Sequence, residues 1–425
     1  MKSHAIVPLA VVAVVVAASA PLLAENWPSW RGPGGMGISV DAAAPTRWTK
    51  TDNVRWRVEL PEPGNSTPVV WGDRVFVTQA LATQNRRTII CFDRATGKLL
   101  WQSGVTYAQP DITHPTNPLA SPSPVTDGQL VYAWFGSGGL AAYDFTGRQV
   151  WLRDLGPQKH TWGYASSPVL SGDRLILNFG PGARAFVIAL DKKTGATAWQ
   201  FDIPPSVGIP AAGWTAEDMY GSWGTPLVVR TDGRDELIVS GPRRVYALDP
   251  AKGTIIWTSE GLSDLVYSSP VSAAGVVVAM GGFGGASLAA RLGGSGDVTN
   301  SHRLWQTPRS RQMIGSGVIK DGYVYVVDAG GIAECMDVQT GKVVWTQRLR
   351  SSGDEGVWSS LVLNQDKIYV MNKAADVFIF KAAPRFELLA TNALGEDTNS
   401  SVVISDGDIF LRTHAALWSI SEKPR

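Results

Sequence analysis

Charged residues are scarce in this sequence, and the two signs are balanced. Only 18% of the 425 residues are charged, and the formal net charge is +1. Proteins that bind nucleic acid usually carry a basic excess, which this chain lacks, so we expect no nucleic-acid partner. The 44% hydrophobic content and the 45 glycines instead fit an all-β globular fold with many tight turns.

Cysteine is nearly absent, with only two residues in the chain, Cys91 and Cys335. Two cysteines in an exported protein suggest a disulfide. Both, however, stand two residues before the same Asp of a repeat that recurs along the chain. Equivalent positions of distant repeats should lie far apart, so we expect two small buried thiols rather than a bridge.

Long apolar runs are confined to the start of the chain. Residues 1–24 combine Lys2, an apolar run from Ile6 to Ala20 and a cleavage site after the small residue Ala24, which is the pattern of a signal peptide. The run is too short for a comfortable membrane span. Removing residues 1–24 leaves 37 basic and 37 acidic side chains. We therefore expect an exported protein, periplasmic or secreted, with no transmembrane segment after cleavage.

The dominant feature of the sequence is a repeat, clearest between residues 335 and 345. A strand-like run ends at Asp337, Thr340-Gly341 follows, and a second run leads to Trp345. Gly adopts positive φ without steric cost and an Asp side chain caps turn amides, so each copy predicts a β-hairpin. The tryptophan supplies a large apolar face suited to the space between two packed sheets.

The spacing of the copies predicts the architecture. Consecutive repeat tryptophans are 40 to 58 residues apart, and four strand-like runs lie in each interval. This period is typical of β-propeller blades. We predict an eight-bladed propeller of four-stranded blades over residues 53–421. The repeat tryptophans are Trp56, Trp101, Trp151, Trp199, Trp257, Trp305 and Trp345.

Two segments do not follow the repeat. Residues 25–52 contain Trp27 and Trp30 without strand alternation, and we expect them to form an N-terminal strap that lies against the ring. In the fifth blade a Gly-rich stretch, residues 291–301, replaces the Asp-Thr-Gly turn.

At the ends of the chain, residues 53–58 form one strand and residues 402–420 form three. We expect them to complete one blade together, which removes the open sheet edges.

Candidate binding residues lie just before the innermost strand of each blade, where a propeller's central channel has its rim. Aromatic and amide side chains recur there, and the neighbouring loops carry the acidic pairs Glu217-Asp218, Asp354-Glu355 and Glu396-Asp397. This mixture indicates a cleft for a cationic or peptide-like ligand; the alternative is that these are ordinary solvated loops with paired charges. The predicted ligand-binding residues are Asn65, Asn117, His160, Trp162, Tyr164, Trp223, Tyr267, Arg311, Trp358 and Asn399.

The Ala-x-Asp-x-x-Thr-Gly-x-x-x-Trp copies with Ser-Ser-Pro strand openings resemble the pyrroloquinoline-quinone-like (PQQ-like) propeller repeat. Quinoprotein alcohol dehydrogenases and outer-membrane protein assembly factor B share this repeat. Resemblance to the enzymes implies PQQ, calcium, an adjacent-cysteine disulfide and an Asp base. Resemblance to the assembly factor implies a protein partner. Cys91 and Cys335 are not adjacent, and no spacing identifies a calcium site.

Other catalytic patterns are missing from the sequence. The histidines have no zinc-ligand spacing, Gly281–Gly285 lacks the Lys of a phosphate-binding loop, and no serine sits in a nucleophile elbow. We predict no catalytic residue, no metal ligand and no cofactor. The favoured function is a non-catalytic exported binding or assembly scaffold that takes a protein, a peptide or a small ligand at the channel rim. The alternative is a PQQ-dependent dehydrogenase.

Overall fold

The computed structural model describes residues 25–40, 43–109, 111, 113–205, 215, 220–308, 311–351, 353 and 356–422. The predicted signal peptide lies outside these residues. Within them the regular structure is almost entirely β. The helical elements described are three short 3-10 turns, η1 (Pro33–Gly35), η2 (Ala82–Gln84) and η3 (Gly136–Gly138). In the described part of the chain, no helix has the length and apolar character needed to cross a membrane.

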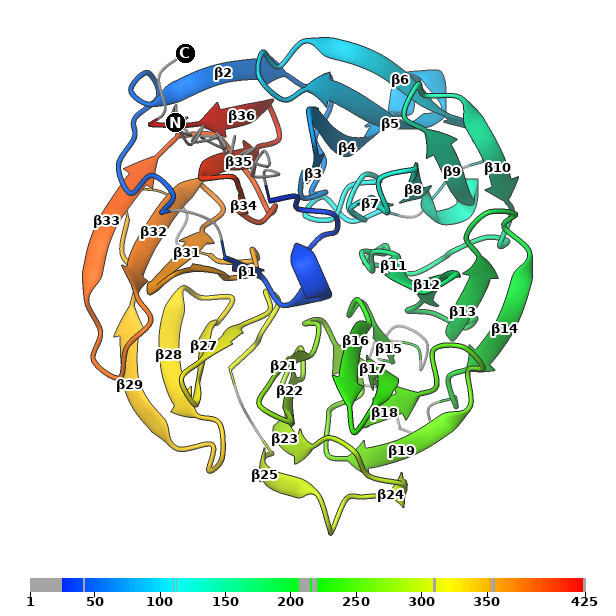
Figure 1. Cartoon of the computed structure of the whole chain (residues 1–425), viewed down its shortest axis with the longest axis vertical. Coiled ribbons are helices and arrows are strands. Elements are labelled where there is room, and N and C mark those ends of the chain that lie inside the picture. Colours follow the sequence, from blue (N-terminus) through cyan, green and yellow to red (C-terminus); the bar gives the residue numbers. More distant parts are fainter. Residues whose placement is uncertain are drawn as a thin grey trace, which may run out of the picture.

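Eight antiparallel sheets are arranged in a closed ring around a central axis (Figure 1). Each contains four strands arranged from the axis outward. The first four blades are β3 (Val69–Trp71), β4 (Arg74–Leu81), β5 (Arg86–Asp93), β6 (Leu99–Thr106); β7 (Val125–Thr126), β8 (Leu130–Trp134), β9 (Leu140–Asp144), β10 (Gln149–Arg153); β11 (Val169–Ser171), β12 (Arg174–Phe179), β13 (Phe186–Asp191), β14 (Thr197–Asp202); and β16 (Leu227–Thr231), β17 (Arg234–Gly241), β18 (Arg244–Leu248), β19 (Ile255–Glu260).

The next four blades complete the ring, and a few short strands pair outside the basic pattern. Blades five to eight are β21 (Val271–Ala273), β22 (Val276–Met280), β23 (Ser287–Arg291), β25 (Arg303–Thr307); β26 (Val318–Lys320), β27 (Tyr323–Val327), β28 (Ile332–Asp337), β29 (Val343–Arg348); β30 (Val362–Asn364), β31 (Lys367–Met371), β32 (Asp376–Lys381), β33 (Leu388–Ala393); and β34 (Val403–Ser405), β35 (Asp408–Arg412), β36 (Ala416–Ile420), β2 (Val54–Glu59). The additional strands are β1 (Ile38–Ser39) on β30, β24 (Gly296–Asp297) on β19, and β15 (Gly221–Ser222) paired with β20 (Leu265–Val266).

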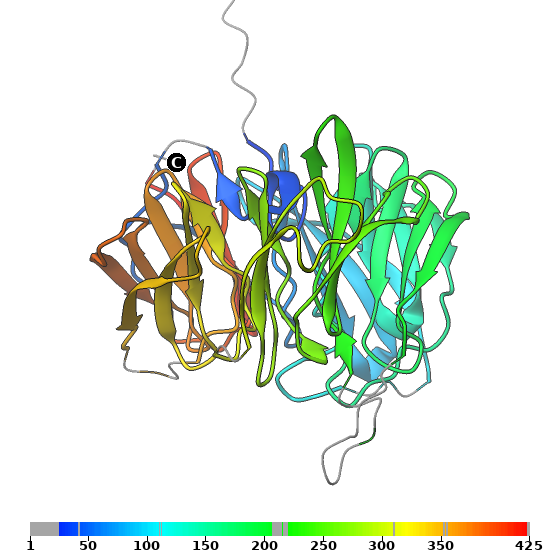
Figure 2. The ribbon, with the colours of Figure 1, turned by 90° about the horizontal axis from the view of Figure 1, so that it is seen from below.

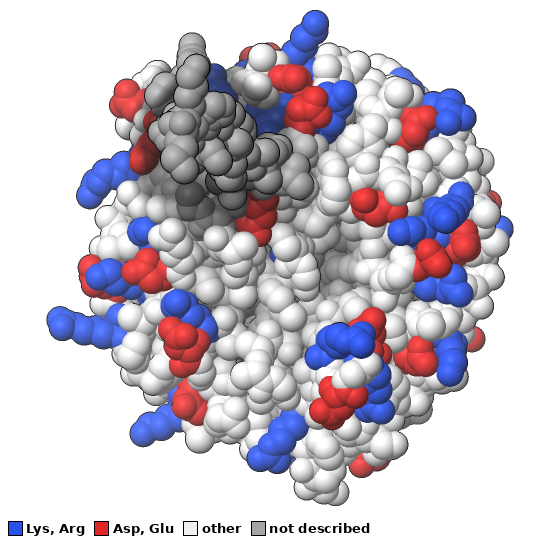
Figure 3. All heavy atoms as spheres, in the orientation of Figure 1, with Lys and Arg blue, Asp and Glu red and all other residues white. Residues whose placement is uncertain are grey.

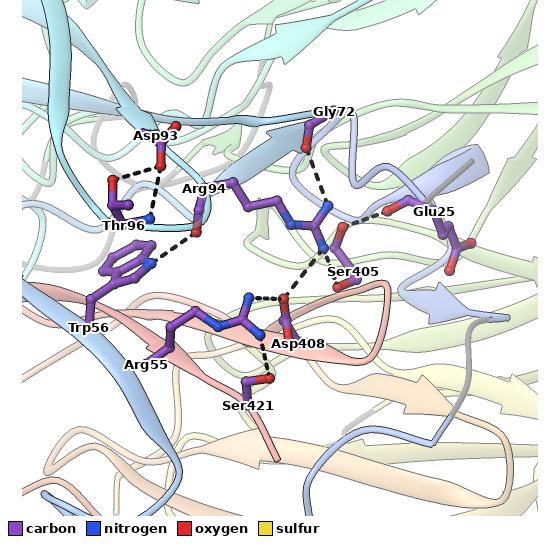
Figure 4. Close-up of polar contacts among 10 residues, drawn as sticks. All are labelled: Glu25, Arg55, Trp56, Gly72, Asp93, Arg94, Thr96, Ser405, Asp408 and Ser421. Carbon is purple, nitrogen blue, oxygen red and sulfur yellow. Dashed lines mark hydrogen bonds and ion pairs between the residues drawn. The ribbon is translucent and has the colours of Figure 1, made fainter. Parts of the chain in front are cut away.

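The eighth blade confirms the predicted closure and the predicted eight-bladed fold. Its outer strand, β2, comes from the N-terminal part of the chain and pairs with β36 from the C-terminal part. Asp408 of this blade forms ion pairs with Arg55 on β2 and with Arg94 of the first blade, at 2.9 and 3.8 Å (Figure 4). Sheet pairing and a charged network therefore fasten the two ends of the chain at one seam.

A ring of hydroxyl groups joins the inner strands of all eight blades. In each blade the backbone N–H of one Ser or Thr donates to the hydroxyl of its counterpart in the next blade, at 2.7–3.2 Å. The circuit returns to its start, because Ser401 N–H donates to Thr67 Oγ1. These residues account for the recurrent Ser and Thr before the inner strands. The members are Thr67, Ser123, Ser167, Thr225, Ser269, Ser316, Ser360 and Ser401.

The repeat tryptophans bind each blade to the next one. Trp305, for example, donates from Nε1 to the carbonyl of Val338 at 2.8 Å, in the Asp-Thr-Gly turn of the following blade. Gly341 of that turn has a φ of 69°, and a Cβ there would lie 2.7 Å from the Trp305 ring. Glycine is therefore required twice, for its backbone conformation and for the close approach of the ring. Equivalent bonds of 2.9–3.0 Å are made by Trp56, Trp101, Trp151, Trp199 and Trp345.

Trp257 differs because the fifth blade lacks this turn. The Gly-rich stretch instead contributes β24, which pairs with β19 so that Gly296 lies opposite Trp257. Trp257 is fully buried and donates from Nε1 to Glu236 Oε2 of its own blade at 2.8 Å. A buried carboxylate thus replaces the missing turn carbonyl, and Arg234 pairs with its other oxygen at 2.8 Å.

The strap crosses one end of the ring (Figure 2). Trp27 is fully buried and forms a two-way backbone bridge with Val70 of the first blade. Arg31, 4% exposed, donates to the carbonyls of Ser316, Gly317 and Leu361 on the far side. Burial lowers the pKa of Arg31 to about 9. The strap is therefore held at both sides of the channel by backbone bonds and one buried guanidinium.

The cysteines behave as expected from their repeat positions. Cys91 lies on β5 and Cys335 on β28, in the first and sixth blades, and both are buried and free. Burial raises their thiol pKa values to about 12 and about 11. The prediction of two small buried thiols without a disulfide is confirmed.

Candidate functional site

A cavity of about 430 Å³ lies on the propeller axis. Most of its lining comes from the residues just before the inner strands, together with four hydroxyls of the Ser/Thr ring. Trp30 of the strap also contributes, and the strap and η1 lie over the centre of the ring at one end (Figures 1 and 2). The loops that precede the inner strands surround the other end. The volume is within the usual range of small-molecule sites, about 300–1,000 Å³.

Aromatic side chains form much of the wall. The rings of Trp162 and Trp223 are 6.2 Å apart and inclined at 43°, and Tyr267 meets Trp223 edge to face at 5.1 Å. Phe283, which is 62% exposed, and the partly buried Trp358 also line the cavity. Burial raises the pKa of Tyr267 to about 12, so its phenol is neutral at physiological pH. The inclined rings offer apolar faces in several directions.

Three predicted asparagines stand among these aromatic rings. Asn65 and Asn399 both donate from Nδ2 to the carbonyl of Thr116 at 3.1 Å, so one backbone oxygen ties two blades together. Asn117 donates to the carbonyl of Trp162 at 2.7 Å, which fixes the loop that carries that ring. The Oδ1 atom of Asn399 is buried and has no hydrogen-bond partner in the structure. The site therefore includes a fixed amide acceptor that is left unused.

The structure thus brings seven of the ten predicted residues to the cavity. These are Asn65, Asn117, Trp162, Trp223, Tyr267, Trp358 and Asn399. The other three lie elsewhere. His160 is buried and packs edge to face against Trp223 at 4.9 Å, so it supports the wall from behind. Tyr164 is buried against Trp134, and its hydroxyl donates to the Leu119 carbonyl at 3.1 Å. Arg311 pairs with Glu334 and Asp328, at 3.1 and 3.5 Å.

Charged side chains are missing from the described lining of the cavity. Two of the acidic pairs named above lie outside the described residues. In the third, Glu396 pairs with Arg57 at 2.8 Å. Burial favours the protonated form of Glu396, but hydrogen bonds from Thr413, Arg57 and Trp418 outweigh it and lower its pKa. The expected preference for a cationic ligand therefore has no support from the described lining.

His414, which contacts Asn65 Oδ1 at 3.1 Å, has its pKa lowered by burial and by Arg412.

The sequence did not single out several residues that line the cavity. Trp30 reaches it only because the strap crosses the axis, and Phe283 because the loop after β22 extends to the rim. Thr116 and Gln312 belong to connecting loops whose paths depend on tertiary contacts. The four ring hydroxyls had a sequence signal in the recurrent Ser or Thr of the strand openings.

The described residues provide little material for a metal site or for acid–base catalysis. Among the residues with assigned positions, no group of three or more His, Cys, Asp or Glu side chains could hold a metal ion. Of the lining side chains, His114 and Tyr267 are the titratable ones. His114 Nδ1 is 2.7 Å from Thr116 Oγ1, a neutral partner. The arrangement offers aromatic contact surfaces and neutral hydrogen-bonding groups.

Comparison with known proteins links the chain to both groups that share this repeat. A family model described as outer membrane protein assembly factor BamB matches residues 43–178 and 183–423. The assembly factor BamB of Yersinia pestis is 24% identical over 273 residues, covering 61% of this chain and 63% of that protein. A polyvinylalcohol dehydrogenase from Pseudomonas is 22% identical over 383 residues, covering 81% of this chain and 55% of that enzyme.

The solved structures include a quinohemoprotein alcohol dehydrogenase from Comamonas testosteroni. It superposes with a TM-score of 0.66 and 13% identity, over 94% of this chain and 81% of that chain. At this identity the likeness shows the fold alone. The matches span less than two thirds of the length of the two relatives above, 63% and 55%.

Proposed function

The chain belongs to the family described as outer membrane protein assembly factor BamB, a PQQ-like β-propeller family, and on this premise we propose that it is a non-catalytic binding scaffold. Its binding site is the channel cavity and the rim around it. The ligand is a protein segment or a small molecule. Export to the periplasm or beyond is part of the proposal, supported by the signal-like residues 1–24 and by the relatives named as outer membrane assembly factors.

The observation that carries this proposal is the composition of the cavity. Six aromatic side chains line the cavity and come from different parts of the chain, and the described lining contains no Asp, Glu, Lys or Arg. Aromatic residues at the centre of an interface supply much of its binding energy because they bury a large area with little loss of conformational entropy. Catalysis of proton transfer, in contrast, requires a titratable group placed at the reacting atoms, and the described lining offers only His114 and Tyr267.

The alternative is a PQQ-dependent dehydrogenase, favoured by the similarity to the polyvinylalcohol dehydrogenase. PQQ carries several carboxylates and would require cationic partners in a buried site. The described lining residues include neither Lys nor Arg to pair with them. Calcium would require several oxygen ligands, usually including carboxylates, and the lining offers only neutral ones. The residues present do not fit this cofactor pair, so we prefer the scaffold.

The scaffold proposal predicts that rim aromatics determine partner capture. Trp358 is partly exposed and Phe283 is 62% exposed, so their replacement by alanine should leave the fold intact. We expect the combined variant Trp358→Ala, Phe283→Ala to retain partners at least about fivefold less well than the unchanged protein. The measurement is quantitative mass spectrometry after cross-linking in the envelope fraction of the source cells and affinity capture.

Leu388→Ala is the matched control. Leu388 is 48% exposed and lies on β33, the outer strand of the blade that Trp358 precedes. Its loss removes a similar apolar contact away from the channel, and capture should be unchanged. Equal capture by all three proteins would remove the channel rim from the binding site.

A further inference from the structure

The charge distribution around the axis restricts the chemistry of a ligand. In the part of the cavity wall that the structure describes, every polar side chain is an amide, a hydroxyl, an indole or the imidazole of His114, and none is Asp, Glu, Lys or Arg. Lys373 lies 4.7 Å over the Trp358 ring but does not itself line the cavity. On the strap face, charged side chains are spread over the disc in pairs of opposite sign, and the surface directly around the axis is mostly uncharged (Figure 3). An ion entering the cavity would lose water without gaining a counter-charge.

Hydrogen-bonding capacity nevertheless remains inside the cavity. Each hydroxyl of the Ser/Thr ring accepts a backbone N–H and keeps its own proton for donation. Four of these residues, Thr67, Ser167, Thr225 and Ser401, line the cavity. Asn399 also lines the cavity, and its Oδ1, which is closed to solvent in this structure, has no hydrogen-bond partner. A purely apolar ligand would exclude water from these groups and leave them unsatisfied, at a cost in affinity.

We propose that the cavity binds a neutral, hydroxyl-rich ligand, namely the end of an uncharged oligosaccharide. This assignment rests on the proposed binding function and names its ligand class. A pyranose ring exposes C–H groups on its faces and hydroxyls around its edge. Rings such as Trp162, Trp223 and Trp358 can cover the C–H faces, while the amide and hydroxyl side chains of the lining can exchange hydrogen bonds with the sugar hydroxyls.

The shape of the cavity suits a chain end better than a chain passing through. Trp30, held by the buried Arg31, stands at the strap end of the channel. The opposite end is bordered by the rim loops, where Phe283 is 62% exposed. A sugar would enter from the loop side with its terminal unit toward Trp30, and the next unit would meet the exposed rim.

Calorimetric titration of the purified protein tests this assignment. The probes are cellotriose, maltotriose, xylotriose and tri-N-acetylchitotriose, each at millimolar concentration. Trigalacturonate and chitosan trimer serve as charged sugars of similar size, and a capped neutral tripeptide serves as the non-sugar probe. We expect at least one neutral trisaccharide to bind, with charged sugars at least about tenfold weaker. Trp358→Ala should weaken binding at least about tenfold, and Leu388→Ala should not.

Failure of the sugar assignment can be distinguished from failure of the scaffold. Absence of binding by all four neutral sugars overturns the assignment, as does equal binding of a charged sugar or preference for the tripeptide. If partner capture still depends on Trp358 and Phe283 in that case, the scaffold stands with another ligand. If a sugar binds equally to the unchanged protein and to Trp358→Ala, its site lies outside this cavity and the assignment is wrong.

Discussion

Replacement of Trp257 by alanine is expected to lower the free energy of unfolding by about 3–5 kcal/mol. Trp257 is fully buried under β24 and is the hydrogen-bond donor to Glu236. Its loss opens a large cavity between the blades. It also leaves one oxygen of a carboxylate with 0% exposure without a donor. Both effects act in the same direction. The measurement is equilibrium denaturation followed by circular dichroism.

Two variants separate the effects of volume and hydrogen bonding. Trp257→Phe keeps most of the ring but removes the N–H. Its free energy of unfolding should therefore fall less than that of Trp257→Ala, but it should still be less stable than the unchanged protein because Glu236 loses its donor. Trp345→Ala removes a partly exposed tryptophan whose partner is the Ala383 carbonyl at 3.0 Å, which water can satisfy after substitution. It should therefore cost less than Trp257→Ala. A smaller loss for Trp257→Ala than for Trp345→Ala would contradict the role given to β24 and Glu236.

Replacement of Asp408 by alanine is expected to destabilise the protein by about 3 kcal/mol, because it removes the shared carboxylate of the closure seam. The Asp408 side chain is 3% exposed, and Arg55 and Arg94 are mostly buried beside it. Arg94 also donates to the Ser405 carbonyl at 2.7 Å, and its own carbonyl accepts the Trp56 N–H (Figure 4). Loss of the carboxylate leaves two cations near each other without their counter-ion.

Asp73→Ala is the control for this prediction. Asp73 pairs with Arg74 at 3.0 Å, but its side chain is 77% exposed, so solvent screens the pair. Asp73→Ala should therefore lower the free energy of unfolding by less than about 1 kcal/mol. Denaturation of both variants should show Asp408→Ala unfolding at clearly lower denaturant concentration. Equal midpoints would mean that β2–β36 pairing alone holds the seam.

The propeller was predictable because its information is local and repeated. Each Asp-Thr-Gly turn and each tryptophan encodes a hairpin and its contact with the next blade, and the missing strands at the two ends indicated the closure. The exception at Trp257 could be predicted only in part from the sequence. The Gly-rich stretch showed that a turn was missing, but its pairing with β19 and the substitution of Glu236 for a carbonyl depend on contacts between distant residues.

The site was predictable in position and less so in side-chain direction. Counting back from the inner strands placed Asn65, Trp223 and Asn399 at the axis, since the strand register fixes them. His160 and Tyr164 lie within loops that turn their side chains into the blade packing. Trp30 could not be placed, because its position depends on the contacts of Arg31 with blades nearly three hundred residues away.

The most direct test of the central claim is calorimetric titration of the purified protein with PQQ and calcium, followed by dye-linked alcohol oxidation. A scaffold channel whose described lining lacks Lys, Arg, Asp and Glu should take up neither the quinone nor the metal, and addition of alcohol should cause no reduction of the dye. Tight binding of the quinone in the presence of calcium, with turnover that Trp358→Ala abolishes, would contradict the account and identify the cavity as the active site of a dehydrogenase.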